Sequence, residues 1–160
     1  MMSLCEQVLT RLEGKRLATA ESLTGGRIGA ALTAVPGASR VYAGGVVSYT
    51  DGVKERLLVV PAEALERFGA VSAPVAQAMA QGARRQLQAD VAVSVTGLAG
   101  PGGDAYGNPV GTVFIGYADE IRACAREYHF TGDREQIRTK TVEAALKLLL
   151  EYQNPGINET

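Results

Sequence analysis

Residues 89–97 read ADVAVSVTG, a continuous run of small apolar and β-branched side chains that ends at a glycine. A continuous run of small, mostly apolar side chains is typical of a strand whose two faces are both covered. Strands of this kind belong to parallel or mixed sheets, because the connections between parallel strands place helices on the faces of the sheet. The stretch therefore predicts an α/β fold.

The residues before this strand alternate between short strand-like and helical patterns. The strand-like patterns cover 16–20 and 41–50, and the helical ones cover 3–13, 26–35, 51–58, 61–69 and 72–88. Ser3 is a suitable N-cap for the first helix, and Ser72 for the last of them. The pair Gly44 and Gly45 inside the second strand indicates a bulge or a close approach of another backbone.

The residues after this strand predict a β-hairpin and a long final helix. Val110 to Ala118 and Ile121 to Phe130 alternate between apolar and polar side chains, as hairpin strands do. Asp133 is the expected N-cap of the helix, which turns Val142, Leu146 and Leu149 inward. We expect one domain over residues 1–153, a three-layer α/β/α sandwich on a mixed β-sheet, followed by a frayed tail at 154–160.

Composition and charge exclude several classes of function. The 160 residues carry 16 Lys and Arg against 17 Asp and Glu, so the basic face that nucleic-acid binding requires is not expected. No apolar stretch approaches the roughly 20 residues that span a bilayer, so we expect no membrane association. Charges at Glu6, Arg11 and Glu13 interrupt any signal-peptide pattern. We expect a cytoplasmic protein.

Cysteine and histidine, the usual zinc ligands, are few and scattered. Cys5 and Cys124 lie far apart in the chain, and His129, which is the one histidine, lies in an alternating strand-like run. Neither pattern resembles a zinc site, which needs three or four such ligands close together. We therefore expect neither a metal nor another cofactor.

Three short polar segments follow the three predicted strands of the first two thirds of the chain. They are ESLTGG at 21–26, SYTDGVK at 48–54 and TGLAGPGGD at 96–104. Ligands of such sheets bind at the carboxyl ends of the strands. We expect polar groups from these three segments to converge on one cleft.

Ser22 in the first segment is either a helix cap or a nucleophile. A serine before a helix is more often a cap, but Thr24 lies closer to the expected helix start and can take that role. Gly25 and Gly26 would allow bare backbone N–H groups at the helix N-terminus to face a negative charge. An oxyanion hole or a phosphate site needs that geometry.

A nucleophilic serine requires a base, and Lys54 in the second segment is the candidate. A buried lysine can have its pKa lowered from about 10.4 to roughly 7 or 8, where the neutral amine accepts a proton. Tyr49 precedes it in the same segment. The pattern alone also fits a solvated lysine in the first turn of a helix and an aromatic residue at a strand end.

The third segment predicts a glycine-rich substrate loop. Thr96 would offer its hydroxyl at the base of the loop, followed by Gly97 and Gly100. The match of GPGGDA to a dinucleotide-binding pattern is weak, because Pro101 lacks an N–H group and Pro109 prevents a helix from starting there. A simple connection before the hairpin fits the loop equally well.

Arg134 and Arg138 lie four residues apart near the start of the final helix. Arginine suits phosphate binding because its planar guanidinium offers paired donors, and the helix N-terminus adds positive potential. The alternative is that Asp133 and Glu135 pair with these arginines at the surface.

These segments, taken together, resemble a known family. ESLTGG, SYTDGVK, RFGAVSAPV, SVTGLAGPGG, NPVGTVFIGY and FTGDREQIR occur in the order and approximate spacing of the C-terminal domain of the competence/damage-inducible protein CinA, the nicotinamide mononucleotide amidohydrolases. The resemblance covers Leu4 to Tyr152. Many members carry a further, N-terminal nucleotide-pyrophosphatase domain, which we do not expect in this chain.

The resemblance implies an α/β/α fold and metal-independent hydrolysis of nicotinamide mononucleotide to nicotinate mononucleotide and ammonia. It implies that Ser22 is the nucleophile, that Tyr49 and Lys54 assist it, and that Thr96 and an arginine, Arg134 or Arg138, contact the substrate. It also implies a homodimer. The rival hypotheses are a catalytically silent nucleotide-binding module that uses the same cleft, and an assembly scaffold that pairs through the hairpin at 110–130.

Overall fold

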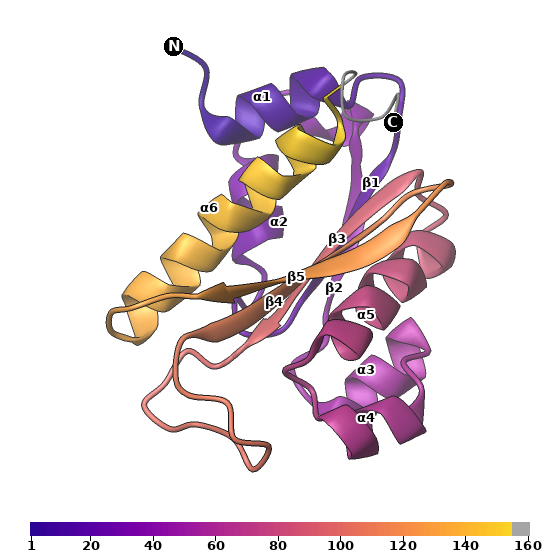
Figure 1. The fold of residues 1–160 in the computed structure, drawn as a ribbon. Coiled ribbons are helices and arrows are strands. Elements are labelled where there is room, and N and C mark those ends of the chain that lie inside the picture. Colours follow the sequence, from indigo (N-terminus) through magenta and orange to yellow (C-terminus); the bar gives the residue numbers. More distant parts are fainter. Residues whose placement is uncertain (155–160) are drawn as a thin grey trace.

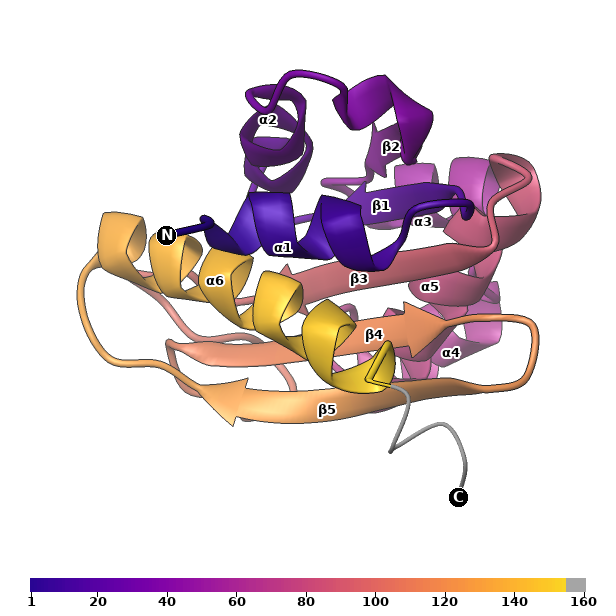
Figure 2. The same cartoon turned by 90° about the horizontal axis from the view of Figure 1, so that it is seen from above.

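One mixed sheet of five strands forms the centre of the molecule, in the order β2-β1-β3-β4-β5 (Figures 1 and 2). In this computed structural model, which describes residues 1–154, the strands are β1 (Leu17–Glu21), β2 (Tyr42–Val47), β3 (Val91–Gly97), β4 (Thr112–Ala118) and β5 (Ala123–His129). Strand β1 pairs in parallel with β2 and β3, whereas β4 pairs antiparallel with β3 and β5. The predicted frayed tail lies, apart from Asn154, outside the described residues.

Helices cover both faces of this sheet. They are α1 (Leu4–Arg11), α2 (Arg27–Thr33), α3 (Asp51–Leu58), α4 (Ala62–Phe68), α5 (Ala73–Gln86) and α6 (Arg134–Tyr152), with a short 3-10 helix at Ala38–Arg40. Helices α1, α2 and α6 lie on one face, and α3, α4 and α5 on the other (Figure 2). This arrangement confirms the predicted three-layer α/β/α sandwich on a mixed sheet.

Strand β3 is buried on both faces, as its composition predicts. Val91, Val93 and Val95 pack into the core beneath α1, α2 and α6. Ala92, between them, packs with Met79 of α5 on the opposite side. Complete burial of a valine side chain stabilises a fold by about 1.5–3 kcal/mol relative to leaving it exposed, so β3 stabilises both layers at once.

Most predicted elements are confirmed, with shifts of a few residues at their ends. Ser3 caps α1 by accepting a hydrogen bond from the Glu6 amide, and Asp133 caps α6 in a reciprocal pair with Gln136. On α6, Leu146 and Leu149 are buried as expected, whereas Val142 is only partly buried. Strand β1 begins and ends one residue later than predicted, so Glu21 is its last residue.

The glycine pair in β2, Gly44 and Gly45, lies at a bulge and at a close approach of the neighbouring strand, the two features that the sequence indicated. Leu17 pairs with Tyr42 but Ala18 pairs with Gly44, so one extra residue bulges from β2. A Cβ atom at Gly45 would overlap the hydroxyl of Thr19 on the neighbouring strand. Beyond the bulge the register is regular, and Val47 at the end of β2 pairs with Glu21 at the end of β1.

None of the helices within residues 1–154 combines the length and apolar character that crossing a membrane requires.

Candidate active site

The carboxyl ends of β1 and β3, together with the segment after β2, surround a cavity of about 430 Å³. A volume of this size suits a small-molecule ligand. The cavity is lined by Ser22, Leu23, Tyr49, Asp51, Lys54, Ala70, Val71, Thr96, Gly97, Leu98, Ala99, Gly100, Gly102, Asp104, Ala105, Tyr106 and Arg134. The three polar segments that follow the strands therefore meet, as expected, in one place.

Ser22 is held by the sheet that precedes it. Its amide donates to the carbonyl oxygen of Val95 at 3.1 Å, which continues the pairing of β1 with β3 one residue past the strand end. Its own carbonyl accepts from the Gly25 amide at 3.1 Å and so closes a tight turn. The backbone on both sides of the Ser22 hydroxyl is thus fixed.

Lys54 on α3 reaches the Ser22 hydroxyl from the opposite wall. Its side chain is 1% exposed, and Nζ donates to Ser22 Oγ at 3.0 Å and to the Ser48 carbonyl at 2.6 Å. Burial lowers the pKa of Lys54 to about 8, although the nearby Asp51 carboxylate opposes the change. A lysine with this pKa is partly neutral near pH 7 and can act as a base.

Ser48 connects this pair to β1. Its amide donates to the Glu21 carbonyl at 2.8 Å, while its carbonyl accepts from Lys54. Its hydroxyl is completely buried and is the one such side-chain oxygen, among the residues described, without a hydrogen-bond partner.

The carboxylate of Glu21 caps helix α2, a role that the sequence interpretation gave to Thr24. Its Oε1 accepts from Thr24 Oγ1 at 2.5 Å and from the Ile28 amide at 2.9 Å, and its Oε2 accepts from the Gly29 amide at 3.1 Å. Thr24 is fully buried and donates its hydroxyl hydrogen to Glu21 instead of accepting from the helix. The prediction that Thr24 is the cap is wrong because the longer glutamate side chain reaches the helix from the strand end.

Most amides at the start of α2, where an anion site was expected, have partners within the protein. Gly25 and Gly26 have positive φ angles of 59° and 103°, which explains why the turn requires glycine. However, the Gly25 amide donates to the Ser22 carbonyl and the Arg27 amide to the Thr24 carbonyl. The Ile28 and Gly29 amides donate to Glu21. These N–H groups are already satisfied within the protein, and neither glycine lines the cavity.

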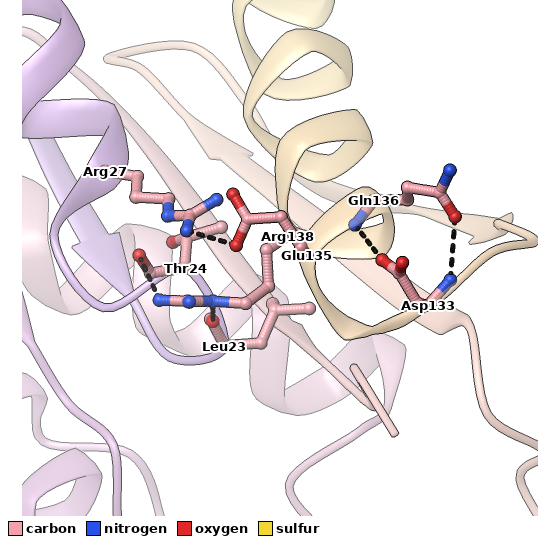
Figure 3. A network of polar contacts seen from close by, with 7 residues as sticks. All are labelled: Leu23, Thr24, Arg27, Asp133, Glu135, Gln136 and Arg138. Carbon is pink, nitrogen blue, oxygen red and sulfur yellow. Dashed lines mark hydrogen bonds and ion pairs between the residues drawn. The ribbon is translucent and has the colours of Figure 1, made fainter. Parts of the chain in front are cut away.

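Arg138 contacts the serine turn instead of the cavity. Its Nε donates to the Leu23 carbonyl at 2.8 Å and its Nη2 to the Thr24 carbonyl at 3.3 Å (Figure 3). Since Arg138 does not line the cavity, the structure does not bring it to a position for binding phosphate there. It anchors the turn to α6.

Among the described residues, neither Asp133 nor Glu135 forms an ion pair within 4 Å with Arg134 or Arg138. Glu135 pairs with Arg27 of α2 at 2.6 Å, and Asp133 caps α6 through Gln136 (Figure 3).

Arg134 and Tyr49 meet at the rim of the cavity. Arg134 Nη2 donates to the Tyr49 hydroxyl at 3.3 Å, and Nη1 donates to the Gly100 carbonyl at 2.6 Å. Tyr49 is 60% exposed. In the described part of the chain, Lys54 Nζ donates to Ser22 and Ser48, whereas the Tyr49 hydroxyl accepts from Arg134. Tyr49 and Lys54 are therefore not hydrogen-bonded to each other there.

The glycine-rich loop after β3 is tied down, so it is more than a loose connection. The Tyr106 hydroxyl donates to the Glu66 carbonyl of α4 at 2.7 Å, and Asn108 Nδ2 donates to the Val71 carbonyl at 3.1 Å. Hydrogen bonds from Asn108 and Tyr106 hold the pKa of the Asp104 carboxyl below its usual value. The loop therefore forms a fixed wall of the cavity.

Thr96 lies at the base of this loop, as predicted, but its hydroxyl hydrogen is already used. It donates to the Ala70 carbonyl at 2.8 Å, so only the lone pairs of its oxygen remain for a ligand. Thr96, Gly97 and Gly100 all line the cavity.

Glu21, Ser48 and Tyr106 are residues of this region that the sequence interpretation missed. The one available signal was that Glu21 directly precedes Ser22 at the end of an apolar strand, where a buried charge needs a reason. Ser48 and Tyr106 carry no comparable signal, because their contacts depend on how distant segments fold together.

The remaining candidate ligands lie elsewhere. His129 ends β5, as expected of a strand residue, and its Nε2 lies 2.6 Å from a Glu127 carboxylate oxygen. In the range 1–154, no cluster of three or more His, Cys, Asp or Glu side chains could hold a metal ion.

Comparison with known proteins places this architecture in a family. The family model described as the CinA C-terminal domain matches residues 2–153. The chain belongs to the CinA C-terminal domain family. Two similar CinA-family sequences are a putative competence-damage inducible protein of Desulforamulus reducens, 51% identical over 89% of this chain, and a CinA-like protein of Geobacter metallireducens, 50% identical over 88%.

Crystal structures of CinA-family proteins share the fold. The Klebsiella pneumoniae 700603 protein of the competence-damaged (CinA) superfamily superposes with a TM-score of 0.91 at 37% identity, covering 94% of this chain and 95% of that one. A competence/damage inducible protein of Agrobacterium tumefaciens gives 0.90 at 39% identity, covering 94% of each.

The chain spans about a third of the length of these two curated relatives, 35% and 34%.

Proposed function

We propose that this CinA-family chain hydrolyses the carboxamide of nicotinamide mononucleotide to nicotinate mononucleotide and ammonia, without a metal ion. The observation that carries the proposal is the contact of Lys54 Nζ with Ser22 Oγ at 3.0 Å, at a lysine that is 1% exposed and whose pKa is lowered to about 8. A desolvated amine beside a serine hydroxyl is the arrangement that a lysine base requires.

In the proposed reaction, neutral Lys54 accepts the Ser22 hydroxyl proton while Ser22 Oγ attacks the carboxamide carbon. The resulting tetrahedral intermediate carries its negative charge on the former carbonyl oxygen. Lys54 then gives the proton to the leaving nitrogen, ammonia departs, and an ester between Ser22 and the nicotinate group remains. Water, deprotonated by the same lysine, then attacks the ester carbon. The bond from that carbon to Ser22 Oγ breaks, Lys54 returns the proton to Oγ, and nicotinate mononucleotide is released.

The oxyanion is proposed to bind to backbone amides of residues that line the cavity. Leu23, next to Ser22, and Ala99 and Gly100 in the glycine-rich loop are the candidates. The Arg27, Ile28 and Gly29 amides at the start of α2 are not candidates, because they donate to the Thr24 carbonyl and to the Glu21 carboxylate. Loss of one such donor in other enzymes lowers the rate by about 10²–10³-fold.

Arg134 is proposed to bind the phosphate, because its guanidinium lies at the open rim and lines the cavity. Tyr49 accepts a hydrogen bond from Arg134. We propose that Tyr49 contacts the bound nucleotide at the same rim and does not assist Lys54 directly. An aromatic side chain that is 60% exposed at a cavity mouth has surface available to cover a ligand.

The test is ammonia release from a panel of pyridine-nucleotide amides that includes nicotinamide mononucleotide. We expect turnover by the wild type and a loss on the order of 10³-fold or more in Ser22→Ala and Lys54→Ala. Lys147→Ala is the matched control, because Lys147 is exposed on α6 and forms an ion pair with Glu143 on the same helix. Full activity of Ser22→Ala would exclude Ser22 as the nucleophile.

The catalytically silent nucleotide-binding module predicts a different result in the same assay. It predicts that nicotinamide mononucleotide binds with micromolar or tighter affinity in a titration while no ammonia is released by any variant.

A further inference from the structure

We propose that Glu21 is a positioning residue of this active site, whose buried carboxylate fixes the turn that carries Ser22 and thereby holds Ser22 Oγ against Lys54 Nζ. The inference rests on the proposed serine–lysine hydrolysis, because the geometry that it explains is the contact between those two side chains.

The carboxylate of Glu21 is bound on both oxygens. Three donors reach it, namely the Thr24 hydroxyl and the amides of Ile28 and Gly29. Thr24 belongs to the serine turn, whereas Ile28 and Gly29 belong to the first turn of α2. One side chain therefore ties the turn after Ser22 to the helix that follows it.

The backbone of Glu21 holds the other half of the site. Its carbonyl accepts from the Ser48 amide at 2.8 Å, and the Ser48 carbonyl accepts from Lys54 Nζ at 2.6 Å. Lys54 Nζ in turn donates to Ser22 Oγ, and Ser22 is bonded covalently to Glu21. These hydrogen bonds and the peptide bond between Glu21 and Ser22 form a closed ring. The ring restricts the distance between Lys54 Nζ and Ser22 Oγ.

Burial makes the carboxylate contacts necessary. Glu21 is 2% exposed, and within residues 1–154 it has no ion pair with a lysine or arginine. A buried charge persists only where hydrogen bonds replace its hydration. The hydroxyl and the two amides supply that replacement only while the turn and the start of α2 keep this arrangement.

A glutamine at position 21 has the same shape but one fewer accepting oxygen. Its amide nitrogen would meet either the Gly29 N–H or the Thr24 and Ile28 donors, and a donor cannot bind another donor. The turn must then shift to relieve the conflict, and Ser22 moves with it. A misplacement of about 1 Å in an active site can lower the rate by about 10²-fold.

The experiment compares Glu21→Gln with Glu135→Gln in two assays at pH 9, where Lys54 is largely neutral. Glu135 is the matched control because it holds α2 from outside, through Arg27. The first assay is steady-state ammonia release from nicotinamide mononucleotide, and the second is the rate at which a fluorophosphonate probe labels Ser22. The probe reports on the activated serine whatever the natural substrate is.

We expect Glu21→Gln to lower kcat by about 10–100-fold with KM unchanged, to slow labelling by a similar factor, and to leave the far-ultraviolet circular dichroism of the wild type. We expect Glu135→Gln to match the wild type in both assays. A Glu21→Gln variant with wild-type kcat and labelling rate overturns the inference, as does a drop in kcat that Glu135→Gln reproduces.

Thr24→Val provides a second variant if Glu21→Gln does not fold. It removes one of the three donors to the carboxylate while keeping the side-chain shape, and we expect a smaller fall in kcat with KM unchanged. Wild-type kcat in a folded Thr24→Val would then overturn the inference. If the wild type is labelled at Ser22 but releases no ammonia, the proposed function fails, and the labelling rates alone decide the role of Glu21.

Discussion

Lys54 combines a buried amine with two hydrogen-bond acceptors, the Ser22 hydroxyl and the Ser48 carbonyl. Desolvation penalises the charged form, which is why the pKa of Lys54 falls to about 8. Asp51, three residues earlier on α3, is the charge that limits this fall. The working pH of the proposed base is thus set by burial and by one carboxylate.

Replacing Asp51 tests that balance. Asp51→Asn removes the negative charge that favours the ammonium form, so we expect the pKa of Lys54 to fall below 8. The pH at which ammonia release reaches half its maximum should move to a lower value. The control is Glu55→Gln, at an exposed position beside Lys54. An unchanged profile in Asp51→Asn would mean that Asp51 does not act on Lys54.

The lowered pKa also makes stability depend on pH. Below pH 8 Lys54 is charged in both states, and the folded protein bears the full cost of a buried ammonium. As the pH rises from 8 toward the unfolded value of 10.5, the unfolded chain binds the extra proton, so the free energy of unfolding increases.

Urea denaturation of the wild type and Lys54→Met measures this effect. We expect the stability of the wild type relative to the variant to rise by about 2–3 kcal/mol between pH 7 and pH 10. Lys147→Met is the control, because Lys147 is 61% exposed and its removal should give no such trend. A difference between wild type and Lys54→Met that is constant with pH would refute the lowered pKa.

At the scale of single residues, the sequence located the site but not the function of each polar group. Ser22, Lys54, Thr96 and Arg134 all line the cavity, because strand ends of a parallel sheet lie at one edge. Arg138 and Thr24 face inward to other partners instead. That difference depends on side-chain reach from Glu21 and on the docking of α6, which no local pattern encodes.

Among the elements, α3 determines where Lys54 lies, and its position depends on Gly82 of α5. A Cβ atom at Gly82 would overlap the carbonyl oxygen of Leu58, the last residue of α3. Backbone cannot move aside as a flexible side chain can, so the close contact of α5 with the end of α3 requires glycine.

We expect Gly82→Ala to lower the free energy of unfolding by about 3 kcal/mol and to reduce turnover, because α3 must move away and carry Lys54 with it. Gly52→Ala on α3 is the matched control, since a Cβ there meets nothing within 4 Å, and the better helix propensity of alanine should raise stability by about 0.5–1 kcal/mol. Thermal unfolding distinguishes the two. Equal stability of both variants would contradict the packing argument.

Sequence patterns predicted the type of nearly every element. The helical periodicity is confirmed in α6, whose buried residues recur on one face. The predicted hairpin forms, but β4 is buried at every position and so lacks the alternation that the sequence pattern indicated. The bulge in β2 was indicated by its glycines. The end of β1 was misplaced by one residue, and that residue is Glu21, whose burial depends on the contacts of α2 rather than on the strand.

For the whole molecule, the three layers leave the proposed site at one edge of the sheet and leave β5 at the end of the strand order. We propose a homodimer, as the resemblance to the CinA family implies. Sedimentation velocity at micromolar concentration should give a single species of twice the monomer mass. A monomer at all concentrations that support turnover would contradict this proposal.

The pH dependence of ammonia release from nicotinamide mononucleotide, measured side by side for the wild type and Ser22→Ala, tests the central claim most directly. The claim is that neutral Lys54 activates Ser22. It predicts that kcat/KM of the wild type rises about tenfold per pH unit below pH 8 and levels off above it, while Ser22→Ala stays at background throughout. A wild-type rate that does not change between pH 6 and pH 9, or a Ser22→Ala variant that follows the wild-type curve, would contradict it.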